Sequence, residues 1–193
     1  KQNEENSDLV YVKKTLEQIE KLNSLITDLL DVSKIENGKL KINKKSENLE
    51  LVIQNAIETI LHTNSTDVKI ERHGMQPDFV IPFDKIRIEQ VLINFLSNAI
   101  KYSPKNNQII VTTFWDEKEV RISVTDFGIG IPDFKQEYVF HKFYRVEESS
   151  LQFQGMGIGL YICSEIIKQH HGSIGVSSEI GEGSTFYFTL PIN

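Results

Sequence analysis

The sequence contains a single cysteine, Cys163, and no long apolar run. One cysteine excludes a disulfide framework and indicates a reducing compartment, and the apolar neighbours of Cys163 predict a small core residue. No apolar stretch approaches the roughly 20 residues that span a bilayer, and no signal-peptide pattern is present. Because the chain begins at Lys1, without a Met, we expect the cytoplasmic portion of a longer protein, whose membrane contact would come only through segments absent from this chain.

Positive charge is also scarce, since 21 Lys and Arg stand against 27 Asp and Glu and the net charge is -6. Proteins that bind duplex nucleic acid concentrate Lys and Arg to neutralise phosphates, so we expect no nucleic-acid partner. Any phosphate that this protein binds must be held locally. The length of 193 residues, 39% of them hydrophobic, suits one folded domain with an attached element.

Residues 8–36 carry apolar side chains on alternating three- and four-residue steps, which predicts one long helix with a wide apolar face. Such a face needs more than one partner helix, as in a four-helix bundle, so we expect dimerisation through this helix. The alternative is a helix that folds back on its own domain. Asn37 and Gly38 tolerate a left-handed conformation and should end the helix. The predicted domains are therefore residues 1–38 and 39–193.

The second domain alternates between strand and helix patterns. Helices are predicted over 48–61, 84–102 and 157–170. Strands are predicted over 39–43, 67–72, 78–82, 108–115, 119–125, 173–178 and 184–190, with an irregular stretch from about 126 to 155. Hairpin-paired strands beside three helices predict an α/β two-layer sandwich with a mixed sheet.

The predicted helix over 84–102 carries Asn94 and Asn98 four residues apart, so both amides project from one face, with Lys101 and Tyr102 one turn further on. Taken alone, such an Asn is most often a surface or capping residue. A side-chain carbonyl is nevertheless a hard oxygen ligand for magnesium, and an ammonium group can contact phosphate. The face therefore predicts a site for a magnesium-bound phosphate.

Asp126 stands at the end of an alternating strand and is followed by Gly128 and Gly130. A carboxylate there can accept a hydrogen bond from the exocyclic amine of adenine, and glycines let the backbone approach a flat ring. The alternative is a plain Gly-rich turn. Asp126-Phe127-Gly128 also spells the magnesium tripeptide of protein kinases, but the sequence has no Val-Ala-Ile-Lys strand and no His-Arg-Asp loop. We therefore predict an adenine pocket.

A second glycine run, Gly155, Gly157 and Gly159, opens the predicted helix over 157–170. Backbone N–H groups and the positive end of a helix dipole could hold phosphates there. The spacing differs from Gly-x-Gly-x-x-Gly and no βαβ unit precedes it, which argues against a dinucleotide site. The connection between the two glycine runs carries aromatic anchors and positive charge, and its length suits a lid over the nucleotide.

In order along the chain, five segments resemble the N, G1, F, G2 and G3 boxes of bacterial sensor histidine kinases. They are Asn94–Tyr102, Asp126–Gly130, Phe140–Arg145, Gly155–Gly159 and Gly181–Phe186. Residues 8–38, with the run Leu29–Glu36, resemble the second helix of that family's dimerisation and phosphotransfer domain. The resemblance implies a Bergerat-type ATP-binding fold, ATP and Mg2+ as ligands, autophosphorylation of a histidine, a homodimeric parent and a response regulator as partner.

The resemblance also assigns roles by position. It makes Asn98 the metal ligand, Asn94 and Lys101 catalytic as well as nucleotide-binding, Tyr102 a ribose-side contact, and Asp126 the residue that reads adenine. Arg145 would reach the phosphates from the lid. The remaining residues implied to bind nucleotide are Gly128, Gly130, Gly155, Gly157, Gly159 and Thr185.

None of the five histidines has the His-Glu/Asp-x-Arg/Lys-x-Pro neighbours of a phosphoacceptor, so we expect the acceptor histidine outside this chain. The rival class is a Bergerat-fold ATPase of the gyrase, mismatch-repair or chaperone type, which places a Glu four residues before the magnesium Asn as general base. Here that position is Asn94, which cannot accept a proton. A third alternative is an adaptor that senses nucleotide without catalysis.

Overall fold

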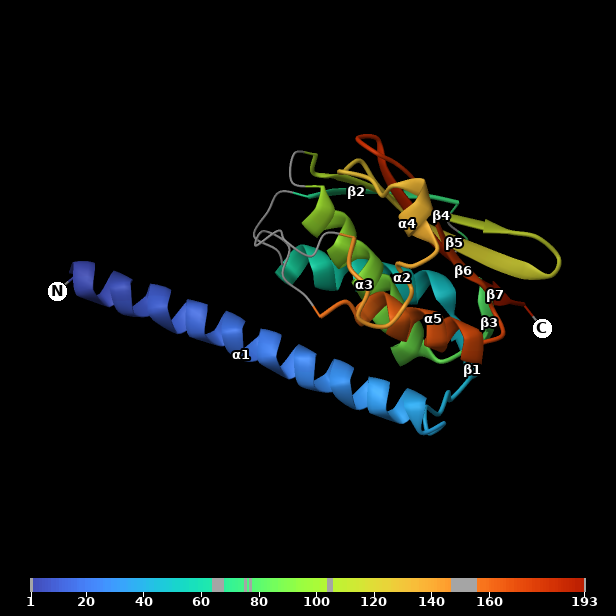
Figure 1. Cartoon of the computed structure of the whole chain (residues 1–193), viewed down its shortest axis with the longest axis horizontal. Coiled ribbons are helices and arrows are strands. Elements are labelled where there is room, and N and C mark those ends of the chain that lie inside the picture. Colours follow the sequence, from blue (N-terminus) through green and yellow to red (C-terminus); the bar gives the residue numbers. More distant parts are fainter. Residues whose placement is uncertain are drawn as a thin grey trace. The chain divides into compact units, whose positions relative to one another are not determined.

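The computed structural model describes residues 2–63, 68–74, 76, 78–103, 106–146 and 156–192, which divide into two units at Leu40 and Lys41. The first unit consists of the helix α1, Gln2–Glu36 (blue in Figure 1). Beyond it Gly38 adopts a φ of 62° and donates its N–H to the carbonyl of Ile35. The predicted end of the helix at Asn37 and Gly38 is therefore confirmed.

The second unit is built on a five-stranded sheet in the order β2-β4-β5-β7-β6. Strands β2 and β4 are parallel, and every other neighbouring pair is antiparallel. A separate antiparallel pair joins β1 to β3. The strand bounds are Lys45–Asn48 (β1), Lys69–His73 (β2), Val80–Phe83 (β3), Gln108–Trp115 (β4), Glu119–Asp126 (β5), Ile174–Glu179 (β6) and Gly183–Pro191 (β7).

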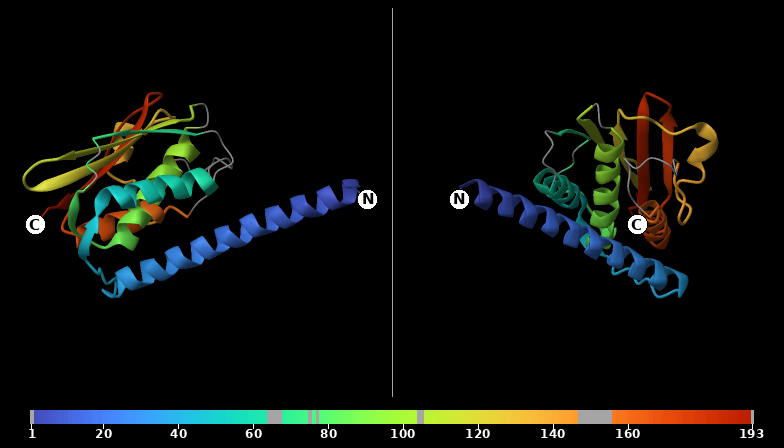
Figure 2. Two further views of the ribbon diagram at one scale, coloured as in Figure 1. Left: turned by 180° about the vertical axis from the view of Figure 1, so that it is seen from behind. Right: turned by 60° about the vertical axis from the view of Figure 1, so that its left-hand side comes forward.

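Three helices cover one face of this sheet: α2, Leu49–Thr63; α3, Lys85–Tyr102; and α5, Gly159–Gln169 (Figure 2, right). The single turn α4, Asp133–Gln136, lies beside β6. Between the layers the fully buried Phe95 of α3 packs on Phe186 and Phe188 of β7, with ring centroids 5.5 and 6.0 Å away. The predicted α/β two-layer sandwich with a mixed sheet is confirmed.

Two predicted details are wrong. Residues 39–43 form no strand, because the N–H of Asn43 donates to the side chain of Asp84 instead of to a neighbouring strand, and β1 begins only at Lys45. The general expectation of hairpin-paired strands also fails for β2 and β3, although they follow one another in the chain. Since β3 pairs with β1, β2 is left to pair with β4 in parallel.

Cys163 is 1% exposed in α5, which confirms its prediction as a core residue. Within the described residues no helix combines the length and apolar character that crossing a bilayer requires.

Candidate functional site

Helix α3 presents the two predicted amides at its middle. Asp84 caps the helix by accepting a hydrogen bond from the N–H of Arg87 at 3.2 Å, and a row of apolar residues faces the core. On the adjoining, half-buried face the Asn98 Nδ2 donates to the Asn94 Oδ1 at 3.1 Å. The Asn98 carboxamide therefore turns its oxygen away from Asn94, as a metal ligand on this face would require.

The first turn of α5 packs directly on this pair. A Cβ at Gly159 would lie 2.3 Å from the Asn94 Nδ2, so a larger residue here would displace the Asn94 side chain. Ile158, at the N-cap of α5, provides no side-chain hydrogen bond to the helix end. The positive end of the α5 dipole is thus brought beside Asn94 without a side-chain cap, an arrangement suited to an anion.

Gly157 brings the connection between the glycine runs against the same end of α5. With a φ of 69°, a Cβ at Gly157 would lie 2.6 Å from the Tyr144 carbonyl oxygen and 3.1 Å from the Arg145 Cγ. Phe140 anchors the connection to the core through Phe186, at a centroid distance of 6.3 Å. Arg145 and Gly157 are therefore neighbours. Gly155 and residues 147–154, the last part of the predicted lid, lie outside the described residues.

Tyr102, the last residue of α3, contacts the glycine run that follows Asp126. The Tyr102 carbonyl accepts a hydrogen bond from the N–H of Ile129 at 3.1 Å, and a Cβ at Gly128 would lie 2.1 Å from the same oxygen. Gly130 has a φ of 71° and leaves no room for a Cβ, which would meet the Glu179 carbonyl oxygen at 2.0 Å. The Lys101 Nζ lies 4.8 Å from the centre of the Tyr102 ring. Helix α3 thus contacts both glycine runs.

Asp126 is the last residue of β5 and is buried, with 4% of the residue exposed. Its Oδ1 accepts a hydrogen bond from the N–H of Gly128 at 2.9 Å. Burial raises the pKa of Asp126 to about 6, against the opposing effect of backbone hydrogen bonds from Gly128 and Ser184. A buried carboxylate with an elevated pKa is poised to gain from an additional hydrogen-bond donor, such as the amine of a base.

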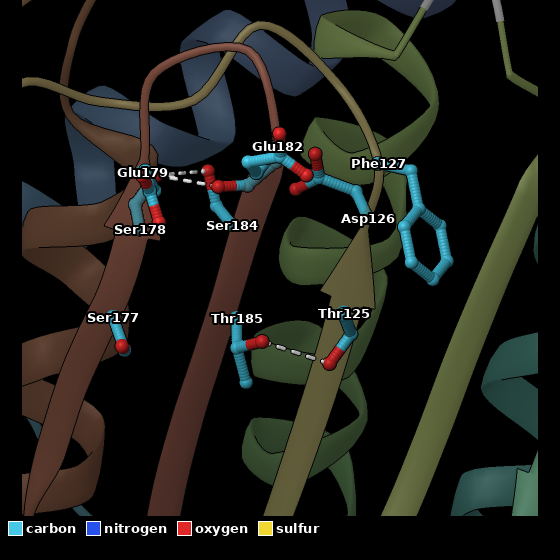
Figure 3. Close-up of a pocket in the computed structure, with 10 residues that line it drawn as sticks. Thr125, Asp126, Phe127, Ser177, Ser178, Glu179, Glu182, Ser184 and Thr185 are labelled. Carbon is cyan, nitrogen blue, oxygen red and sulfur yellow. Dashed lines mark hydrogen bonds between the residues drawn. The ribbon is translucent and has the colours of Figure 1, made fainter.

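Ser184 was missed in the sequence and lies opposite Asp126 in the β5–β7 register. Both side chains lie on the helix-facing side of the sheet. The predicted Thr185 lies on the other side, where its hydroxyl forms a hydrogen bond of 2.9 Å with that of Thr125 (Figure 3). The alternation through Phe186, Phe188 and Leu190, all buried, was the signal that could have identified Ser184.

Asp126 and Ser184 line an open hollow at the ends of β5, β7 and β6, together with Thr125 and Thr185 from the other side of the sheet (Figure 3). Its rim carries two further acidic side chains, Glu179 and Glu182. Negative charge here would repel phosphates but not an uncharged base. The arrangement therefore has two ends, one suited to a base at Asp126 and one suited to phosphate at Gly157, Gly159 and Asn98.

Comparison with known proteins agrees with this geometry. The sequence profile of the histidine kinase-, DNA gyrase B-, and HSP90-like ATPase family matches residues 83–193, more than half of the chain. The chain belongs to this family.

Curated relatives include the adaptive-response sensory kinase SasA of Synechococcus sp. (strain JA-3-3Ab), 34% identical over 91% of this chain and 47% of its own length. Another is the sensor histidine kinase WalK of Bacillus subtilis, 34% identical over 97% of this chain and 31% of its own length. The chain is therefore homologous to sensor histidine kinases, and it spans about half or less of the length of these relatives.

Among solved structures, the catalytic domain of the histidine kinase ThkA superposes with a TM-score of 0.67 at 28% identity, covering 79% of this chain and 99% of that one. Full-length ShkA, in complex with AMPPNP, superposes with a TM-score of 0.77 at 26% identity, covering 89% of this chain and 36% of that one. The predicted Bergerat-type fold and the histidine kinase resemblance are confirmed.

Proposed function

We propose that this chain is the catalytic part of a sensor histidine kinase, which binds ATP with magnesium and transfers the γ-phosphate to a histidine outside this chain. The proposal rests above all on the position of α3. Its middle touches the first turn of α5 through Asn94 and Gly159, and its last residue holds the loop after Asp126 through the Tyr102 carbonyl. One rigid helix therefore fixes the distance between a base-binding end and a phosphate-binding end.

At the base end, Asp126 would accept from the adenine amine, with Ser184 beside it as a second polar contact. Gly128 and Gly130 hold the loop close to Tyr102 and Glu179, where any larger residue would collide with backbone oxygens. Thr185 would support this end indirectly, through its hydrogen bond to Thr125 on the opposite side of the sheet. Tyr102 would contact the ribose.

At the phosphate end, Lys101 and Arg145 would supply positive charge, and Gly155, Gly157 and Gly159 would supply backbone N–H groups. The Asn98 oxygen, turned away from Asn94, fits a divalent magnesium ion because hard cations prefer oxygen ligands. Magnesium bound with ATP neutralises charge on the phosphates. The contribution of this chain is to hold the triphosphate in place beside the helix dipole of α5.

Asn94 favours transfer to a histidine over hydrolysis. An ATPase of this family class would need a carboxylate at this position to deprotonate water, and an amide cannot do so. The Asn94 oxygen in addition already accepts the hydrogen bond from Asn98. We therefore assign Asn94 to positioning within the catalytic site, with slow steady hydrolysis as the consequence.

Helix α1 would provide the homodimer contact of the parent protein, as the second helix of a dimerisation and phosphotransfer domain. Its apolar side chains are about half exposed, for example Leu16 at 55% and Leu22 at 57%. Burial of these side chains against partner helices would stabilise a bundle. A response regulator would then take the phosphate from the acceptor histidine.

Two measurements test the proposal. Calorimetry with magnesium and a non-hydrolysable ATP analogue should show binding that Asp126→Asn and Asn98→Ala each weaken. With ATP, the chain should phosphorylate a separately supplied helical domain that carries the His-Glu/Asp-x-Arg/Lys-x-Pro sequence, and not the same domain with that histidine replaced. Binding without transfer would favour the nucleotide-sensing adaptor, and rapid turnover that is lost in Asn94→Ala would favour the ATPase.

A further inference from the structure

A buried histidine lies at the end of α3 and α5 that is opposite the nucleotide site. His170 is 1% exposed and follows the last residue of α5. Its Nδ1 lies 2.8 Å from the Ile166 carbonyl oxygen, and its Nε2 accepts a hydrogen bond from the N–H of Asp84 at 3.0 Å. A backbone N–H can only donate, so Nε2 carries no proton and the imidazole is neutral with its proton on Nδ1.

Asp84 uses its two carboxylate oxygens for two different purposes. Oδ1 caps α3 by accepting from the N–H of Arg87, whereas Oδ2 accepts from the N–H of Asn43 at 2.8 Å. The next residue, Lys44, donates from its Nζ to the His170 carbonyl oxygen at 3.2 Å. A cation at a helix C-terminus is also favoured by the helix dipole. Asn43 and Lys44 are thus attached to the ends of both helices.

These two residues come just after the boundary between the two units, at Leu40 and Lys41. Helix α3 starts beside Asp84 and reaches Asn98 about 20 Å further along its axis. Helix α5 runs back from Gly159 to His170, so the two helices are antiparallel. The helices that form the nucleotide site at one end therefore hold the incoming chain at the other.

We propose that Asp84 and His170 are positioning residues that fix Asn43 and Lys44 to the catalytic unit, so that freedom between the two units is confined to the residues between α1 and Asn43. The consequence for phosphotransfer rests on the proposed function, in which the catalytic unit must reach an acceptor histidine. The length of the free connection sets how often tethered partners meet. Release of Asn43 and Lys44 would lengthen that connection.

Protonation of His170 is the change that should release the segment. A proton on Nε2 would face the Asp84 N–H, and the acceptor would be lost. Burial lowers the pKa of His170 most strongly. Of the groups that face the ring, the Ile166 carbonyl and Asp84 raise this pKa, whereas Lys44 and His171 lower it. The segment should therefore be held at neutral pH and released at a pH below the ordinary range of histidine.

The first test separates the two functions of Asp84 in the 193-residue chain by hydrogen–deuterium exchange of the peptide that contains residues 41–48. Asp84→Ser retains a side-chain oxygen to cap α3 but is too short to hold Asn43 as well. We expect exchange in residues 43–45 to rise about tenfold, as for loss of one charged hydrogen bond. Exchange along α3 should stay as in the wild type, and Lys168→Ala, on the exposed surface of α5, should change neither.

Asp84→Ala, which removes both the cap and the acceptor, should accelerate exchange in α3 as well. Unchanged exchange in residues 43–45 of Asp84→Ser would overturn the proposal. These measurements need no nucleotide, so a failure of the proposed function, seen as absent binding of the ATP analogue, would be recognised separately.

The second test measures how exchange depends on pH. If His170 had a merely structural role, its replacement would not change this dependence. Exchange in residues 43–45, corrected for the intrinsic effect of pH, should accelerate as the wild-type chain is acidified. His170→Gln offers a side-chain oxygen to the Asp84 N–H and has no proton to gain, so this variant should stay protected. The same pH profile in the wild type and in His170→Gln would overturn the role of His170.

Discussion

The Asn98 amide nitrogen donates to the Asn94 amide oxygen across one turn of α3, and Gly159 gives Asn94 the space to remain there. This contact determines which atom Asn98 offers to a ligand. Nitrogen faces Asn94 and oxygen faces the other way. In the proposed function, Asn94 would therefore act on the magnesium site through Asn98, without having to bind the metal itself.

The first prediction separates these two amides. Asn98→Ala should remove most of the magnesium-dependent gain in affinity for an ATP analogue, at least about tenfold, whereas Asn94→Ala should remove about three- to tenfold through misorientation of Asn98. Affinity without magnesium should change little in either variant. Calorimetry with and without magnesium measures both, with Ser97→Ala on the exposed side of α3 as the control. A wild-type magnesium response in Asn94→Ala would contradict the positioning role.

The second prediction concerns Asp126, whose buried carboxyl has its pKa raised from 3.8 to about 6. Between these two pH values the Asp126 carboxyl is ionised in the unfolded chain and protonated in the folded one. The contribution of Asp126 to the stability of the empty protein should therefore fall as pH rises through this window and level off above it. Asp126→Asn removes the buried charge. It should stabilise the empty protein at pH 8 by about 1–2 kcal/mol, an increase of several degrees in Tm, and give no gain at pH 3.

The same substitution should weaken nucleotide binding, by about 10- to 100-fold, because a charged acceptor is lost. Wild-type affinity should also decline below about pH 6 as Asp126 is protonated. Affinity of Asp126→Asn should decline less steeply, because in this variant only the nucleotide itself titrates. Thermal melts of the empty protein and calorimetry across pH check the two effects. A variant that is both less stable and unchanged in binding would remove Asp126 from the base site.

The third prediction compares two glycines that share a positive φ and differ in their surroundings. Gly130 and Gly181 have φ values of 71° and 84°, but an added Cβ would lie 2.0 Å from the Glu179 carbonyl oxygen at Gly130 and would meet nothing within 4 Å at Gly181. Gly181→Ala should cost about 1 kcal/mol of unfolding free energy from backbone strain alone. Gly130→Ala should cost about 2–4 kcal/mol and also weaken nucleotide binding. Equal costs in urea denaturation would show that the loop can move aside.

The sequence predicted those parts of the fold that local patterns determine. The apolar periodicity of α3 and the alternation in β4 and β5 gave bounds within a residue or two of the structure. Which strands pair with each other was harder to predict, because β1 and β3 pair although α2 lies between them in the sequence, and β2 pairs in parallel with the distant β4. Such pairings depend on the layers as a whole and leave no local signal.

Functional residues also divide into those with a local signal in the sequence and those without one. Asn94, Asn98, Asp126 and the glycines stand out in the sequence because their chemistry and spacing are unusual for a core. Ser184 and His170 do not, since a serine in a strand and a histidine at a helix end are ordinary residues. Their roles can be inferred only from the structure, where Ser184 lies in register with Asp126 and His170 contacts the Asp84 N–H.

The fourth prediction addresses self-association through α1. Leu22 is 57% exposed on this helix, and the neighbouring Asn23 is exposed as well. If α1 packs in a dimeric bundle, the wild-type chain should sediment as a dimer at high concentration, and Leu22→Glu should shift it to the monomer because a charge would be buried. Asn23→Glu is the matched control and should leave the dimer intact, and nucleotide affinity should be the same in all three. A monomeric wild-type chain at every concentration would contradict this role of α1.

The last prediction concerns His171, which adopts a φ of 64° just beyond the end of α5. The N–H of His171 bonds to the Lys168 carbonyl and that of Gly172 to the Ile167 carbonyl, both at 3.0 Å, which is the hydrogen-bond pattern of a Schellman motif. This motif normally places glycine at the left-handed position, because a Cβ there is strained. His171→Gly should therefore stabilise the chain by about 0.5–1 kcal/mol, and His171→Asn by less. Urea denaturation of the two variants and the wild type measures this effect. Because His171 is exposed, its side chain contributes little packing, and a loss of stability in His171→Gly would mean that its ring supports the neighbouring His170 more than its backbone strains the turn.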